Sequence, residues 1–175
     1  MWPALDPLTI SELLHELAAR LAASGATAGV RIVGGAAIAL MNPLRDTTTD
    51  IDAALVPPGP IVSVVSEMAV ERGLPADWLN AAALGFIPPV GLEDWRDVIR
   101  LGTVTIQIAS PELLLAMKLF ANRGTRDAAD IDFLLGHCGV TSVEQAQELY
   151  ERYHAQDVLT DSAAARVQHW LDSRQ

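Results

Sequence analysis

The stretch from Ile32 to Leu55 constrains the fold most, because it joins two short apolar strands through a glycine pair and ends in two closely spaced acids. The first strand stops at Gly34-Gly35, and the second carries Asp50 and Asp52. Since side chains in a strand alternate between faces, residues two apart point the same way. At a rise of about 3.3 Å per residue, the two acids lie within roughly 7 Å of each other on one face.

This acid pair predicts a metal site. Two carboxylates held on one face repel each other unless a cation lies between them, and a divalent metal ion is the usual solution. Mg²⁺ takes oxygen ligands. We therefore expect Asp50 and Asp52 to bind Mg²⁺ or Mn²⁺. Taken alone, an Asp-x-Asp pair has a simpler interpretation, a solvated strand face.

The glycine pair predicts a place for an anion beside that metal site. Without a Cβ, Gly34 and Gly35 allow a tight turn and a close approach of a ligand to the backbone. A helix that starts at Ala36 would point its free N–H groups back toward the turn, and that end of a helix binds anions. Taken alone, a glycine pair after a strand is an ordinary turn, so the prediction depends on both features occurring together.

Gly34-Gly35 followed by the Asp-x-Asp pair on the next strand resembles the signature of the nucleotidyltransferase superfamily, which includes polymerase-beta-like enzymes and minimal nucleotidyltransferases. The resemblance covers the chain from about Ile32 to Leu135. It implies transfer of a nucleoside monophosphate from an NTP to an acceptor hydroxyl. It also implies that the metal binds at the acid pair and that the β- and γ-phosphates lie at the glycine turn.

Arg45, Thr48 and Asp50 further resemble the Arg…Thr-x-Asp-x-Asp variant of the AbiEii-type, toxin-related branch. The resemblance implies that Arg45 and Thr48 lie at the bound nucleotide, where Arg45 offsets charge on the leaving pyrophosphate. It also implies a bacterial toxin–antitoxin or phage-defence setting. The expected acceptor is then an RNA end or a protein, and a cognate antitoxin is an expected partner.

Lys118 is the only lysine in a chain with eleven arginines, and it interrupts the apolar run LLLAMKLFA. A lysine in such a helix can extend along its stem to solvent. Alternatively, its compact ammonium group can meet a phosphate oxygen where a guanidinium would be too broad. The sequence leaves both interpretations of Lys118 open.

Charged residues follow this lysine at Arg123, Arg126, Asp127, Asp130 and Asp132. Ordinary helix chemistry accounts for them if Thr125 is a cap and Asp127 lies in the first turn. Arg126 and Asp130 would then form an i,i+4 pair. The order Lys…Arg-Asp-x-x-Asp-Ile also resembles later motifs of AbiEii-like nucleotidyltransferases. That resemblance implies that Lys118 binds the nucleotide phosphates, and that Asp127 or Asp130 positions or deprotonates the acceptor hydroxyl.

The strand expected at Val104–Ala109 departs from the family pattern. Many members carry a third carboxylate on this strand, whereas the inward candidate here is Gln107. A neutral amide cannot act as a general base. The departure leaves two outcomes open: an enzyme with one metal ion instead of two, or a nucleotide-binding protein without activity.

Composition limits the classes of partner. The net charge of −10 argues against an extended nucleic-acid duplex, because nonspecific duplex binding needs Lys and Arg to neutralise phosphates. Cys138 is the only cysteine, so no internal disulfide or multi-cysteine zinc site is expected. No apolar run is long enough to span a bilayer, and no signal-peptide pattern is present. We therefore expect a cytoplasmic protein with no membrane partner.

The remaining pattern predicts an α+β fold: a small mixed sheet of the nucleotidyltransferase type with helices packed on one side. Helices are expected at Ile10–Ala23, Ile61–Arg72, Glu112–Asn122, Arg126–His137, Val143–His154 and Ala163–Asp172, and strands at Val30–Val33, around the acid pair, at Asp97–Leu101 and at Val104–Ala109. Thr9 or Ser11 would cap the first helix. Between Leu74 and Pro89 we expect a short helix and a loop. We expect one domain over 1–175, with an α/β core over 1–109 and a helical part over 110–175.

The sequence thus predicts a metal-dependent nucleotidyltransferase that uses an NTP. Two alternatives stay open. One is a non-catalytic scaffold of the same fold that binds a nucleotide or a partner protein, and the neutral Gln107 favours it. The other is an aminoglycoside-type antibiotic nucleotidyltransferase, because an acidic surface attracts a cationic acceptor.

Overall fold

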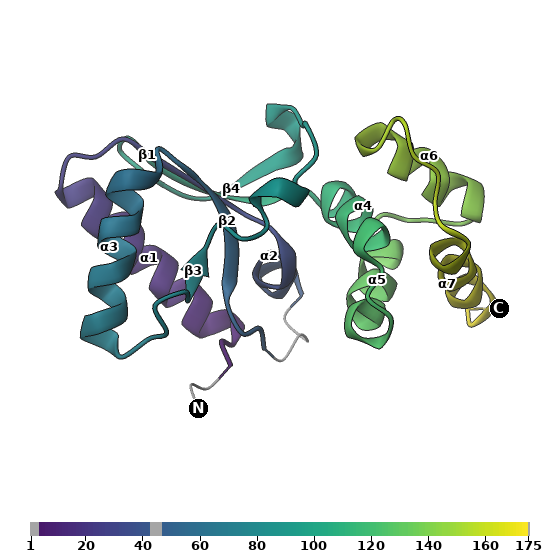
Figure 1. Ribbon diagram of the computed structural model, residues 1–175, viewed down its shortest axis with the longest axis horizontal. Coiled ribbons are helices and arrows are strands. Elements are labelled where there is room, and N and C mark those ends of the chain that lie inside the picture. Colours follow the sequence, from purple (N-terminus) through teal and green to yellow (C-terminus); the bar gives the residue numbers. More distant parts are fainter. Residues whose placement is uncertain (1–3, 43–46, 175) are drawn as a thin grey trace. The chain divides into compact units, whose positions relative to one another are not determined.

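The computed structural model describes residues 4–42 and 47–174. The chain divides into two compact units (Figure 1). The first comprises the residues up to Gly85 together with Trp95–Ala109, and the second comprises Phe86–Asp94 together with the residues from Ser110 onward. The boundary at Ala109 is where strands give way to helices. The short segment Phe86–Asp94 groups with the helical unit although it precedes the last two strands.

Among its described residues, the first unit contains the five strands of the sheet and three α-helices. Its elements are α1 (Pro7–Ala23), β1 (Ala28–Ile32), α2 (Gly34–Met41), β2 (Ile51–Val56), α3 (Pro58–Arg72), β3 (Leu79–Asn80), β4 (Trp95–Leu101) and β5 (Val104–Ala109). The sheet order is β3-β2-β1-β5-β4. Strand β1 pairs antiparallel with β2 and parallel with β5, while β4 and β5 form the antiparallel hairpin. The sheet is therefore mixed, which confirms the predicted α+β class.

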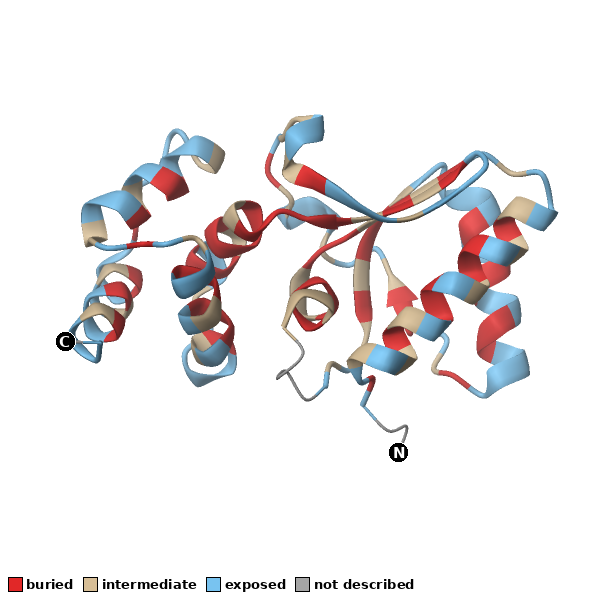
Figure 2. Cartoon of the chain, turned by 180° about the vertical axis from the view of Figure 1, so that it is seen from behind, coloured by how far each residue is buried: buried red, intermediate tan, exposed pale blue. Residues whose placement is uncertain are grey.

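One face of this sheet is apolar and forms the core of the unit. Its side chains include Val30, Ile32, Ile51, Ala53, Ile106 and Ile108, and all are buried. Helices α1 and α3 contact each other. Helix α1 also contacts strands β4 and β5, and helix α3 contacts strand β2. In Figure 2 both helices carry buried residues along one side and exposed residues along the other. Burying each large aliphatic side chain contributes about 1.5–3 kcal/mol, which makes this layer the main source of stability.

Local signals explain where the helices begin, and they correct the predicted cap of the first helix. Helix α1 starts at Pro7 because the Asp6 carboxylate accepts a hydrogen bond from the Thr9 backbone N–H at 2.8 Å. Asp6 is therefore the cap, and the prediction of Thr9 or Ser11 is wrong. Helix α3 starts at Pro58, since proline fits the first helical turn, whose N–H groups have no intrahelical partner.

The two-residue strand β3 was not predicted, because it lies in the segment expected to form a short helix and a loop. Its position depends on a long-range contact: the Ile51 backbone N–H donates to the Trp78 carbonyl at 2.8 Å. The Trp78 indole is buried and donates to the Val65 carbonyl at 3.2 Å. The tryptophan thus attaches this segment to both β2 and α3, which no local pattern could reveal.

The second unit is helical and consists of the short 3₁₀ turn η2 (Leu92–Asp94), α4 (Pro111–Ala121), α5 (Thr125–His137), α6 (Val143–Tyr153) and α7 (Asp161–Asp172). The Ser110 hydroxyl caps α4 by accepting from the Leu113 N–H at 3.1 Å. Helix α5 has Gly124 at its N-cap position with no side-chain hydrogen bond, so the predicted Thr125 cap is wrong. Helix α4 contacts both α5 and α6.

In the part of the chain that the structure covers, no helix combines the length and apolarity needed to cross a membrane.

Candidate functional site

The two acids of the Asp-x-Asp pair lie on the face of the sheet opposite the core. Ile51 and Ala53 are fully buried on the core side, while Asp50 and Asp52 are half-buried. Strand β2 begins at Ile51, so Asp52 points to the second, polar face, whereas Asp50 directly precedes the strand instead of lying on it as predicted. The Asp50 carboxylate reaches the same face through its hydrogen bond from Asn80, the residue in register with Asp52. The Val33 backbone N–H donates to the Asp52 carbonyl at 2.9 Å. The acid-bearing strand is thus hydrogen-bonded to the residue that directly precedes the glycine turn.

Gly34 brings the glycine turn directly against the second acid. It adopts a positive φ of 65°, and a Cβ at this position would lie 3.2 Å from Oδ2 of Asp52. A side chain here would therefore be strained and would press on the carboxylate. Helix α2 begins at Gly34, two residues before the predicted start at Ala36. The N-cap residue Val33 makes no side-chain capping bond, so the side chain that precedes the helix does not occupy its first N–H groups.

Asn80 holds the first acid, and sequence reasoning missed it. Its Nδ2 donates to Oδ2 of Asp50 at 3.2 Å and to the Asp77 carbonyl at 3.2 Å. Its Oδ1 accepts from the Ala82 backbone N–H at 2.8 Å, which fixes the orientation of the amide. Asn80 is also the residue on β3 in register with Asp52. The amide therefore lies at the acid pair from a strand that no sequence signal predicted.

Two threonines complete the surroundings of Asp50. The Thr49 hydroxyl donates to Oδ1 of Asp50 at 3.0 Å. The hydroxyl of Thr48, predicted to lie at the nucleotide, donates to the Asp50 carbonyl at 3.3 Å. The Thr48 backbone pairs with Leu5. Thr48 thus lies beside the acid pair, whereas the predicted Arg45 lies outside the described residues.

The donor set at the acid pair fits Mg²⁺. The described ranges, 4–42 and 47–174, contain no group of three or more His, Cys, Asp or Glu residues that could hold a metal ion. Mg²⁺ is commonly bound through only one or two carboxylates, with water and substrate phosphates as the remaining ligands. Two carboxylates on one face beside a glycine turn match that pattern. Whether a metal ion binds there stays a prediction.

The same polar face carries a chain of hydrogen-bonded side chains across β1, β5 and β4. Nε of Arg31 donates to Oε1 of Gln107 at 3.1 Å, and Nε2 of Gln107 donates to Oδ1 of Asp97 at 2.8 Å. Nε of Arg100 then donates to Oδ2 of Asp97 at 3.0 Å. The Arg31 guanidinium also lies 5.2 Å from the centre of the Trp95 ring. Gln107 therefore lies on the face of the acid pair, as expected, and Arg31 is the basic residue that sequence reasoning missed.

Lys118, Asp127 and Asp130 meet in the second unit. Nζ of Lys118 lies 2.7 Å from Oδ1 of Asp127 and 2.8 Å from Oδ2 of Asp130. The lysine is only 7% exposed and Asp127 is fully buried. The interpretation in which Lys118 extends to solvent is therefore wrong. The predicted Arg126–Asp130 pair is also wrong, because Asp130 lies on the side of α5 that faces the lysine, while Arg126 is exposed.

Arg123 completes this cluster around Asp127. Its backbone N–H, Nε and Nη2 all donate to the Asp127 carboxylate, at 2.9, 3.0 and 3.1 Å. Burial alone would raise the pKa of Asp127. The hydrogen bonds from Arg123 and Lys118 outweigh burial and hold that pKa well below its ordinary value of 3.8. The carboxylate is therefore ionised and paired at neutral pH.

The predicted site residues fall into two sets. Gly34, Gly35, Thr48, Asp50 and Asp52 belong to the first unit, and Lys118, Asp127 and Asp130 belong to the second. The structure brings Gly34 against Asp52 and Thr48 against Asp50 in the first unit. In the second unit it brings Lys118 against both acids of its set. The phosphate-binding role of Lys118 and the acceptor-side role of Asp127 or Asp130 stay predictions.

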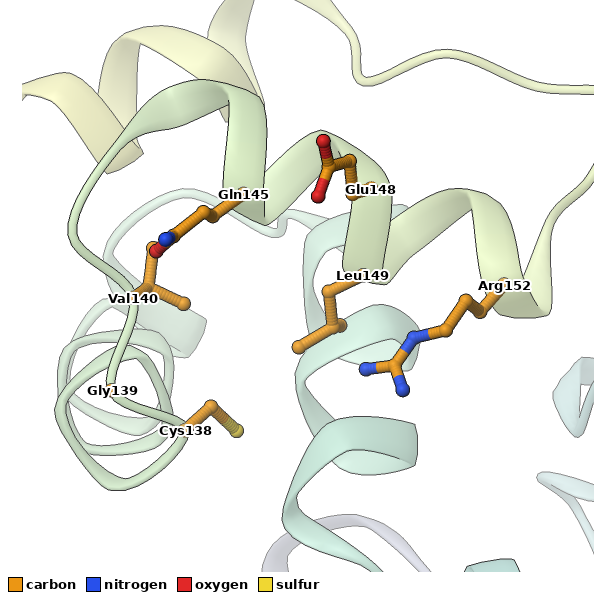
Figure 3. A pocket seen from close by; sticks show the side chains of 7 residues that line it. All are labelled: Cys138, Gly139, Val140, Gln145, Glu148, Leu149 and Arg152. Carbon is orange, nitrogen blue, oxygen red and sulfur yellow. The ribbon is translucent and has the colours of Figure 1, made fainter.

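The second unit also has a surface hollow of about 540 Å³ between the end of α5 and helix α6 (Figure 3). Its lining includes Cys138, Val140, Glu148 and Arg152. None of the predicted site residues lines it, and its mixed lining carries no recognisable chemistry. It plays no part in the candidate site.

Comparison with known families gives one match. The model of a family described as "Nucleotidyltransferase of unknown function (DUF6036)" matches residues 9–171. No curated protein and no solved structure gave a significant match to the chain. The match covers both units and supports the superfamily resemblance, while membership of the AbiEii-type branch stays a prediction.

Proposed function

Since the chain belongs to this nucleotidyltransferase family of unknown function, we propose that it transfers a nucleoside monophosphate from an NTP to an acceptor hydroxyl with the help of Mg²⁺. One observation carries the proposal: the Asp52 carboxylate lies against the Gly34 turn, and Asp50 stands beside it on the same face, held by Asn80. A metal-binding acid pair and an anion-binding turn are thus adjacent, as transfer from a triphosphate requires.

The chain's own residues would position the substrate. Asp50 and Asp52 would hold the metal ion, and Asn80 would fix the orientation of Asp50. The turn at Gly34 and the first N–H groups of α2 would hold phosphate oxygens. Bound at the acid pair, Mg²⁺ would supply positive charge to the phosphate oxygens and to the leaving pyrophosphate. Catalysis by positioning and electrostatics of this kind needs few reactive side chains.

The reaction balances without a further reactant. The acceptor oxygen forms a bond to the α-phosphorus while the bond from that phosphorus to the β-phosphate oxygen breaks. The electron pair leaves with pyrophosphate, and the hydroxyl proton passes to a base or to solvent. The AbiEii-like resemblance suggests an RNA end or a protein as acceptor, and Asp127 or Asp130 as the base, within a toxin–antitoxin or phage-defence pair.

The test is a transfer assay with the full chain, Mg²⁺, each α-labelled NTP, and total RNA, cell protein or an aminoglycoside as acceptor. We expect label in one acceptor class together with pyrophosphate release, and loss of both in Asp52→Asn. Asp132→Asn is the matched control, because it removes the same charge from an exposed position on α5 and should keep full activity. Transfer that persists in Asp52→Asn would refute the proposal.

A second candidate function is a nucleotide-binding scaffold without activity. The neutral Gln107 favours it, because the resemblance predicts a third carboxylate on this strand. In the same assay the scaffold would bind an NTP in an Asp52-dependent manner but release no pyrophosphate with any acceptor.

A further inference from the structure

Arg31 lies on the central strand of the sheet, on the same face as the acid pair. Its registered neighbours are Ala54 on β2 and Gln107 on β5. Ala54 follows Asp52 by two residues, so Asp52 is a diagonal neighbour of Arg31, roughly 7–8 Å away across the two strands. A long basic side chain at that separation can reach a ligand that the carboxylate also contacts.

The guanidinium of Arg31 is held in place by neutral groups. Oε1 of Gln107 accepts from Nε, and the Trp95 ring lies beside the guanidinium in a cation–π contact. Within residues 4–42 and 47–174, no carboxylate lies within ion-pair distance of Arg31, and no residue accepts from its Nη groups. A half-buried charge is costly unless something compensates it. The two Nη groups are therefore available to bind an anion in bidentate fashion.

Gln107 explains why the positive charge of Arg31 has a neutral partner instead of a carboxylate. Its Oε1 faces Arg31 and its Nε2 faces Asp97, so both ends of the amide are used. A glutamate at this position would form an ion pair with Arg31 and would place a second carboxylate against Asp97. The neutral amide orients Arg31 without cancelling its charge. The departure from the family's third acid thus has a structural counterpart in this chain.

We propose that Arg31 is a phosphate-binding residue for the triphosphate of the substrate, and that Gln107 is the positioning residue that keeps the Arg31 charge available. The proposal rests on the proposed function and deepens it: it assigns a basic residue to the acid-pair site in addition to the glycine turn. Arg31 would donate its Nη groups to phosphate oxygens on the side of Asp52 that faces β5.

The test measures binding of each NTP by isothermal titration calorimetry to the full chain with Mg²⁺. Removing hydrogen bonds to a charged group predicts that Arg31→Gln weakens triphosphate binding about 10- to 100-fold. Gln107→Glu should weaken it about tenfold, because the new carboxylate pairs with Arg31. Arg96→Gln is the matched control, because Arg96 is an exposed arginine in register with Ile108, on the opposite face. We expect it to bind like the wild type.

The outcomes separate this inference from the proposed function. If the wild type binds an NTP and Asp52→Asn abolishes binding, but Arg31→Gln binds normally, the inference alone is wrong. If Gln107→Glu strengthens metal-dependent binding, position 107 acts as a missing metal ligand and the inference is again wrong. If the wild type binds no NTP, both fail. If circular dichroism shows that Arg31→Gln does not fold, Arg31→Lys replaces it. This variant should retain part of the affinity for the triphosphate, because lysine keeps the positive charge but lacks the bidentate guanidinium.

Discussion

The buried lysine of the second unit gives the sharpest prediction about stability. Lys118→Met keeps an unbranched side chain of similar length but removes the ammonium that lies 2.7 Å from Asp127 and 2.8 Å from Asp130. Removing one partner from a buried ion pair costs about 3–5 kcal/mol. Asp127 keeps its three hydrogen bonds from Arg123, so we expect the lower end, about 3 kcal/mol.

Urea unfolding followed by tryptophan fluorescence and circular dichroism measures this loss. With a slope of about 1–3 kcal/mol per molar urea, a loss of about 3 kcal/mol lowers the midpoint by about 1–3 M. The matched control is Arg126→Met, which removes the same charge from an exposed position on α5. It should change the unfolding free energy by less than about 0.5 kcal/mol.

The same variant tests the phosphate role of Lys118. If the lysine serves only the cluster with Asp127 and Asp130, the Lys118→Met protein that remains folded binds triphosphate and monophosphate as the wild type does. A loss under about 1 kcal/mol in urea, small for a broken buried pair, would refute the structural reasoning, and a selective loss of triphosphate binding would favour the phosphate role instead.

Three further predictions concern the acid pair and the buried carboxylate. Gly34→Ala should lower the unfolding free energy by about 1–2 kcal/mol, because alanine is strained at positive φ. It should also weaken metal binding, because the new Cβ presses on Asp52. An unchanged affinity for Mn²⁺, measured by electron paramagnetic resonance, would contradict this second expectation. Asn80→Ala should weaken Mn²⁺ binding by loosening Asp50 while the circular dichroism spectrum stays unchanged, and Ala82→Ser, at a neighbouring exposed position, is its control. The lowered pKa of Asp127 adds stability that is fully present above pH 3.8 and is lost as the pH falls further. Asp127→Asn should therefore reduce the loss of unfolding free energy that the wild type shows on acidification. If the variant loses as much stability at low pH as the wild type, Asp127 is not the source of that loss.

Much of the site's framework follows from local sequence. The strand, the glycine turn, the helix and the Asp-x-Asp strand could be predicted because each depends on a short period or on the conformational freedom of glycine. The hairpin between β4 and β5 turns at Gly102, and the Ser110 hydroxyl that caps α4 accepts from an N–H only three residues away, so both features are local as well. The pairing of acids and glycine turn was likewise predicted, and the structure places Gly34 against Asp52.

What the tertiary structure decided is which distant side chains share the polar face. Strand β1 lies between β2 and β5, so Arg31 meets Gln107, 76 residues away, and becomes a neighbour of the acid pair. Asn80 reaches Asp50 only because the buried Trp78 anchors a two-residue strand against β2. Strand order is set by packing between residues far apart in the chain, and no local period encodes it. The sequence therefore determined which groups could do chemistry, whereas the sheet order determined which neutral and basic groups stand beside them.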